Sequence, residues 1–148
     1  SKVLVCRVLM YCLVGRDQAR RDRLNTMARR RISEGDGIAA LRSVLAGSAE
    51  RQLVATAVRF LLEELAERAP GNTVEVRVPP YGATQCVAGP RHTRGTPPNV
   101  VETDPETWIQ LATGSLAWEE GLTSARISAS GTRANLDGLL PLVRPNWV

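Results

Sequence analysis

The sequence predicts a single α/β domain, of the α+β kind, in which helices and short strands share one core. Two observations carry this prediction. The chain has 148 residues, 43% of them hydrophobic, which is enough for one core and argues against a second independent domain. The apolar residues recur at helical spacing between residues 33 and 68, and from residue 74 they switch to strict alternation.

Two helices are expected in the first half of this domain. Apolar residues recur at helical spacing after Ser33, and Gly47 lies where a helix stop belongs. The second helix, from Ser48 to Arg68, is the strongest element of the sequence because one apolar stripe runs along it. Ser48 is its expected N-cap, and Pro70-Gly71 ends it. The stripe consists of Val54, Ala57, Val58, Leu61, Leu62 and Leu65.

Three strands are expected in the middle of the chain. Valines alternate with polar residues over 74–78, which is typical of a half-buried strand. A proline-rich turn at 79–82 leads to a second strand over 83–88. A polar loop over 89–99 then precedes a short third strand at 99–102.

A capped helix is expected to follow the third strand. The sequence Thr103-Asp104-Pro105-Glu106 fits a capping box. In this motif the Thr103 hydroxyl accepts a hydrogen bond from one backbone N–H of the first turn, and the Glu106 side chain accepts one from another backbone N–H. Trp108, Leu111 and Ala112 form the apolar face of this helix, and Gly114 ends it. Asp104 and Glu106 are therefore interpreted as residues of a helix start and not as a catalytic pair.

The end of the chain predicts a helical turn, a fourth strand and a closing helix. The helical turn runs from Trp118 to Leu122, and the strand runs from Ala125 to Ser130 until Gly131 breaks it. The residues of this strand expected to face inward are Ala125, Ile127 and Ala129. The closing helix is expected over 132–140, with Leu136, Leu139 and Leu140 on one side.

The charge divides the chain into two parts. Residues 1–31 carry nine basic and two acidic residues, a net charge of +7, whereas residues 32–148 carry a net charge of −3. We therefore expect a basic N-terminal extension over 1–31, which need not be part of the core, and a mildly acidic domain over 32–148. No nucleic-acid partner is expected for the domain, and its aliphatic composition suits a lipid pocket better than a base-stacking surface.

The extension itself allows several interpretations. Its apolar run over 3–14 is too short to span a membrane, and no small-residue cleavage site follows it. Residues 1–26 could be an over-early start, because Met27 opens a segment typical of a cytosolic N-terminus; otherwise the arginines bind an anionic surface or form a solvated tail. The three cysteines form no CxxC or Cys/His cluster, so a reducing cytoplasm is the expected location.

Catalytic patterns are missing from the sequence. His92 is the only histidine and falls in the loop, and no nucleophile elbow or phosphate-binding loop is present. We therefore expect no enzyme activity, no cofactor and no metal. Cys86 is interpreted as a small buried residue of a strand. The best polar recognition site is the loop with Arg91, His92 and Arg94, whose donors suit a carboxylate or phosphate; the alternative is a solvated connection.

The stretch from Thr103 to Leu116, with its Leu-x-Thr-Gly-x-Leu ending, resembles the C-terminal half of the sterol carrier protein family. A strand ending in glycine and a Leu-rich segment follow in the same order as in that family. Residues 82–141 also resemble the bacterial stand-alone branch, and the resemblance covers about residues 32–143. It implies a mixed sheet of about four to five strands backed by helices around an apolar tunnel; four strands are predicted here, where the family usually has five.

What the resemblance implies about function is non-covalent binding of a lipid, a fatty-acyl group or another apolar small molecule, between the sheet and the helical segment 104–122. The alternative is an accessory or protein-interaction domain, related to those fused to thiol-dependent isomerases and acetyltransferases, with a partner that the sequence does not identify. The expected polar rim is Arg91, His92 and Arg94. The expected apolar lining is Phe60, Val76, Trp108, Leu111, Leu116, Trp118, Leu122, Ile127, Leu136 and Leu140.

Overall fold

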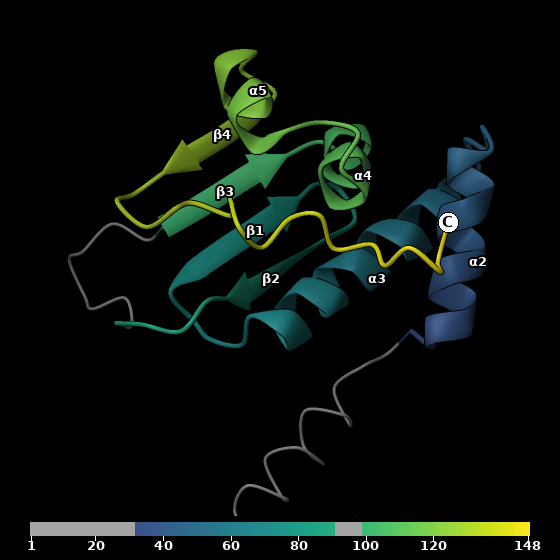
Figure 1. Ribbon diagram of the computed structural model, residues 1–148, viewed down its shortest axis with the longest axis horizontal. Helices are drawn as coiled ribbons and strands as arrows, with labels where there is room; N and C mark the ends of the chain where they lie inside the picture. Colours follow the sequence, from purple (N-terminus) through teal and green to yellow (C-terminus); the bar gives the residue numbers. More distant parts are fainter. Residues whose placement is uncertain (1–31, 91–98) are drawn as a thin grey trace, which may run out of the picture. The chain divides into compact units, whose positions relative to one another are not determined.

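The computed structural model describes residues 32–90 and 99–148, and Ile32–Val148 form one compact unit. The expectations for residues 1–31 and for the loop 91–98 lie outside the described residues. Within the described ranges the elements follow one another in the order α2, α3, β1, β2, β3, α4, α5 and β4 (Figure 1). None of the described helices is long and apolar enough to cross a membrane.

The first two helices are α2, Glu34–Leu45, and α3, Arg51–Arg68. Ser33 caps α2 as its position suggests, because its hydroxyl accepts a hydrogen bond from the Asp36 N–H at 3.1 Å. The N-cap predicted for α3 is wrong. The helix begins three residues after Ser48, whose hydroxyl accepts from the N–H of Glu50 at 3.3 Å and so stabilises the turn before the helix.

The sheet is open and mixed, which confirms the predicted α+β class. Its strands are β1 Val74–Val78, β2 Gly82–Cys86, β3 Asn99–Thr103 and β4 Ile127–Ser130. They lie in the order β2-β1-β3-β4. The central pair β1 and β3 is parallel, and the two outer pairs are antiparallel.

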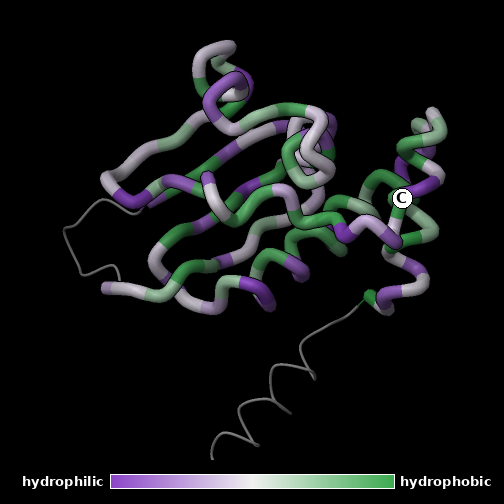
Figure 2. The backbone as a smooth tube through the Cα atoms, viewed as in Figure 1, coloured by the Kyte–Doolittle hydropathy of each residue, from purple (hydrophilic) through white to green (hydrophobic). Residues whose placement is uncertain are grey.

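One face of the sheet is covered by helix and the other is polar. The three valines of β1 are buried, while Glu75 and Arg77 on the opposite face are half-buried and form an ion pair with 2.7 Å between Arg77 Nε and Glu75 Oε1. The alternation is visible along the strand in Figure 2. Helix α3 lies against β2 and α4 (Figure 1), so the hydrophobic core sits between the sheet and the helices.

The next helices are α4, Pro105–Thr113, and α5, Trp118–Thr123. The predicted capping box is wrong by one residue. Asp104 is the N-cap and accepts from the Thr107 N–H at 2.9 Å, because Pro105 occupies the first helical position and shifts the start. The Thr103 hydroxyl donates to the Arg126 carbonyl at 2.9 Å, which ties β3 to the start of β4.

The inward face predicted for the fourth strand is only partly confirmed. Ile127 is buried, but Ala129 is exposed, and Ala125 lies before the strand, exposed, with a φ of 58°. Strand β4 pairs only with β3 and forms an edge of the sheet. A Cβ added to Gly121 of α5 would meet the Ile127 side chain, so the glycine lets α5 approach this residue while the rest of the strand stays uncovered.

The predicted closing helix over 132–140 is wrong, since this segment consists of turns and irregular backbone. Gly131 and Gly138 have φ angles of 98° and 82°, which a helix does not use. The Asn135 side chain accepts from the N–H of Asp137 at 2.8 Å, a local bond that competes with helix formation. Leu136 is nevertheless buried, so the turns bring this leucine into the core without forming a helix.

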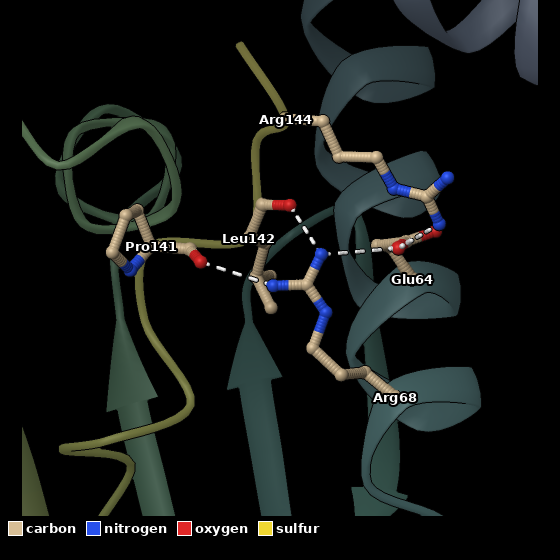
Figure 3. Close-up of polar contacts among 5 residues, drawn as sticks. All are labelled: Glu64, Arg68, Pro141, Leu142 and Arg144. Carbon is tan, nitrogen blue, oxygen red and sulfur yellow. Dashed lines mark hydrogen bonds and ion pairs between the residues drawn. The ribbon is translucent and has the colours of Figure 1, made fainter.

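The last residues, 141–148, which we call the C-terminal segment, are held by hydrogen bonds to the helices and form no helix or strand of their own. The N–H groups of Leu142 and Val143 donate to the Ala112 carbonyl of α4 at 2.8 and 3.1 Å. Arg68 of α3 donates to the carbonyls of Pro141 and Leu142 at 3.0 and 2.6 Å (Figure 3). Arg42 of α2 donates to the Trp147 carbonyl at 2.6 Å.

Candidate ligand-binding site

The structure brings the predicted apolar lining together in one core cluster, which joins α3, β1, β4, α4, α5 and the segment that follows β4. All of the predicted residues are buried except two, which are half-buried and pack against the cluster. The buried ones are Phe60, Val76, Trp108, Leu111, Leu116, Trp118, Ile127 and Leu136, and the half-buried ones are Leu122 and Leu140.

Trp108 fixes the helical wall of this cluster. Its side chain is fully buried, and its indole Nε1–H donates to the Val58 carbonyl of α3 at 3.4 Å. The indole thus meets its one donor requirement while its apolar body packs in the core. This hydrogen bond links α4 to α3 and so helps to hold the two helices at a fixed distance from each other.

The opposite wall is the inner face of the sheet. Val76 pairs with Val101 of β3 in parallel register and both side chains are fully buried, and Ile127 continues this wall on β4. The side chains of these three residues offer no hydrogen-bond donor or acceptor, so any ligand that contacts them is held by burial of apolar area.

The predicted polar rim falls on residues that the structure does not describe: Arg91, His92 and Arg94 lie in 91–98. Its neighbours are described. The Thr73 hydroxyl donates to the Pro90 carbonyl at 3.3 Å, which attaches the start of the loop to the turn before β1. The role of the three residues stays a prediction.

A groove that the sequence interpretation missed lies between the N-terminal half of α3 and the turn that joins β1 to β2. Its volume is about 560 Å³. Both charged and apolar side chains line it, from Glu50, Arg51, Gln52, Ala55, Arg59, Pro80 and Tyr81. The signal available in the sequence is the spacing of Arg51, Ala55 and Arg59, which places all three on one face of a helix.

Cys86, the one cysteine within the described residues, lies in the wall and not in a reactive site. It is fully buried at the end of β2, as predicted, and burial raises the pKa of its thiol to about 11. A thiol with this pKa stays protonated at neutral pH and is a poor nucleophile. Its place here is that of a small apolar side chain.

The carboxylate of Asp104 is occupied by its capping role. Burial acts to raise its pKa, but the hydrogen bonds that it accepts from the N–H and the hydroxyl of Thr107 outweigh burial, so the pKa is lower than the ordinary value of 3.8. It therefore stays ionised at neutral pH, as suits a helix N-terminus. Among the described residues, no group of three or more His, Cys, Asp and Glu side chains could hold a metal ion.

Comparison with known proteins adds one finding. The model of a protein family described as bacterial SCP ortholog, in which SCP stands for sterol carrier protein, matches residues 50–142. The match starts at the N-cap of α3, runs through the whole sheet and ends at Leu142, so it includes every residue of the predicted apolar lining and of the groove. No curated protein sequence matches the chain significantly.

Proposed function

This chain belongs to the family of bacterial sterol carrier protein orthologues, and from that premise we propose that it binds a lipid, a fatty-acyl group or another apolar molecule non-covalently and without catalysis. The observation that carries the proposal is the core cluster itself. Residues that are scattered along the matched range, from Phe60 to Leu140, meet in one apolar cluster between the sheet and the helices.

The chemistry of this cluster supports binding rather than catalysis. The walls from Val76, Ile127 and Trp108 are apolar, and the one indole donor in that set is already bonded to a backbone carbonyl. Cys86 is a protonated thiol, and Asp104 caps a helix. Affinity in such a site comes from apolar area, about 25 cal/mol for each Å² removed from water before ordering costs are subtracted.

A titration with N-phenyl-1-naphthylamine, a neutral fluorescent probe, tests the proposal. We expect saturable fluorescence enhancement. Ile127→Ala should weaken the free energy of probe binding by roughly 1–3 kcal/mol, because the truncation removes apolar area that the probe would contact. Leu45→Ala is the matched control, since Leu45 of α2 is 45% exposed and lies away from the wall.

The same titration separates an apolar site from a reactive one. Cys86→Ser and His92→Ala chains should remain competent to bind the probe, because the proposed binding needs neither a thiol nor an imidazole. Enhancement that does not saturate, or that is the same in the Ile127→Ala and wild-type chains, contradicts the proposal. The remaining interpretation is then a protein-interaction domain, in which the cluster is simply the packed core.

A further inference from the structure

We propose that the groove between α3 and the β1–β2 turn holds the anionic head group of the ligand, a carboxylate or a phosphate, and that its donors are Arg51 and Arg59. This inference rests on the proposed function, because it assigns the polar end of a molecule whose apolar end contacts the core cluster. It follows from the charge, the spacing and the surroundings of these two arginines.

The spacing places the two guanidinium groups on opposite sides of a small floor. Arg51, Ala55 and Arg59 follow one another at intervals of four residues on α3, so they share a face and span about 12 Å along the helix axis. Ala55 is buried between them and has the smallest side chain that a helix favours. The side chains of both arginines line the groove, one on each side of the alanine along the helix.

Arg59 is already oriented across the groove. Its Nε donates to the Tyr81 carbonyl at 2.9 Å, so the plane of the guanidinium is fixed against the β1–β2 turn. Within residues 32–90 and 99–148, its two terminal amino groups have no hydrogen-bond partner, and Arg51 has neither a hydrogen bond nor an ion pair. A planar guanidinium with an open edge matches the geometry of a carboxylate or phosphate.

The net charge of the groove favours an anion. Glu50 is the acidic residue of the lining and offsets one of the two arginines, which leaves a net charge of +1. This contrasts with the charge of −3 on residues 32–148 taken together. An acidic head group is therefore attracted to this groove, and salt should screen the attraction because both arginines are exposed.

Tyr81 connects the groove to the apolar cluster. It lines the groove and also packs, half-buried, against the core. Beside it, a Cβ added at Gly82 would lie 3.4 Å from Leu62 Cδ1, so core side chains come up to this turn. An amphipathic ligand with its head between the arginines can thus place its chain along Tyr81 toward the core, whereas a free anion gains only the polar contacts.

The test compares decanoate, decyl phosphate and 1-decanol, which share a ten-carbon chain and differ in the head group, by calorimetric titration of the full chain. We expect both anionic probes to bind about tenfold more tightly than 1-decanol at low salt, and the advantage to shrink at high salt. The stronger of the two anions identifies the head group. In ¹H–¹⁵N nuclear magnetic resonance spectra of the ¹⁵N-labelled chain, decanoate should shift the backbone amide signals of residues 50–59, 81 and 82.

The variants assign the effect to the two arginines. Arg51→Gln and Arg59→Gln should each weaken decanoate binding about threefold, as expected for an exposed charged pair. The double variant should bind decanoate only as tightly as the wild-type chain binds 1-decanol. Arg59→Lys should keep only part of the advantage, because the charge remains but the planar donor edge and the bond from Nε to the Tyr81 carbonyl are lost. Arg133→Gln is the matched control, since it removes the same charge from an exposed position after β4.

Two results overturn the inference, and they differ in what they say about the proposed function. If 1-decanol binds as tightly as decanoate, or if the double variant keeps the anionic advantage, the head-group site is wrong while apolar binding stands. If none of the three probes binds, both the head-group site and the proposed function are wrong.

Discussion

At the scale of single residues, Cys86 shows how burial decides chemistry. Because the pKa of its thiol is about 11, roughly one molecule in a thousand carries the thiolate at pH 8. We expect iodoacetamide to leave Cys86 unmodified in the folded chain at pH 8 and to label it fully in denaturant, as measured by peptide mass spectrometry. Rapid labelling of the folded chain contradicts the buried position.

Asp104 gives a second test at this scale, because the structure moves the helix cap by one residue from the predicted Thr103. Asp104→Ala should lower the free energy of unfolding by about 1 kcal/mol at pH 7, since the first turn of α4 loses its acceptor. Glu106→Ala removes the side chain that a capping box would need, and it should change the free energy of unfolding by less than about 0.5 kcal/mol. Equal losses in both variants support a capping box instead.

The low pKa of Asp104 also fixes the direction of a pH effect. A carboxylate whose pKa is lowered by folding stabilises the fold above its unfolded value of 3.8 and loses that contribution as the pH falls through the folded value. The stability difference between wild type and Asp104→Ala should therefore be constant near neutral pH and shrink below pH 3.8. Denaturant titrations at a series of pH values measure this difference.

At the scale of elements, the stripe of α3 makes the clearest stability prediction. Leu61 is fully buried between this helix and the sheet, so Leu61→Ala should destabilise the chain by about 2–5 kcal/mol. Leu45→Ala makes the same change at an exposed position of α2 and should cost much less. Chemical denaturation of both variants decides whether α3 faces the core, and equal losses contradict that arrangement.

The C-terminal segment makes a prediction that no periodic pattern suggests. Trp147 is buried, and its ring lies 5.2 Å from that of Phe60, centroid to centroid. Trp147→Ala should therefore cost about 3–5 kcal/mol, whereas Val148→Ala, at a residue 59% exposed, should cost less than about 0.5 kcal/mol. A small loss in both would mean that the segment adds little to the fold.

The anchoring of this segment is electrostatic as well as apolar. Glu64 is buried and forms ion pairs with Arg68 and Arg144, at 3.3 and 3.5 Å between the arginine Nη2 and Glu64 Oε1 (Figure 3). Arg68 in turn holds the two carbonyls of Pro141 and Leu142. The carboxylate therefore positions the arginine that attaches the segment to α3.

How far the sequence predicts each element depends on whether its determinants are local. The apolar stripe of α3 and the alternation of β1 are periodic within the element, and both are confirmed. The predicted helix over 132–140 has the same leucine spacing, but Gly138 and the bond between Asn135 and Asp137 favour turns. The spacing of apolar residues alone therefore does not distinguish a helix from a series of turns.

Long-range pairing sets the features that the sequence does not predict. The exposure of Ala129 follows from the edge position of β4, and that position depends on which strands pair. The groove needs residues of α3 and of the β1–β2 turn, more than twenty positions apart, to lie side by side. The predicted apolar lining does converge in the core cluster, and most of its members belong to a local apolar pattern.

At the scale of the whole molecule, the compact unit begins at Ile32, whose N–H donates to Glu63 Oε2 at 3.3 Å. A chain that starts at Met27 keeps this contact and every other contact of the described unit. Its melting temperature should match that of the full chain within error. A loss of several degrees would show that residues 1–26 stabilise the domain.

The central claim is that the cluster between the sheet and the helices receives an apolar ligand. It is tested most directly by intermolecular nuclear Overhauser effects between ¹³C-labelled methyl groups of the chain and 1-decanol. The account predicts contacts from the ligand chain to the inward methyl groups of Val76 and Ile127. Contacts only to the exposed methyl groups of Leu45 and Val148, or none at all, would contradict it.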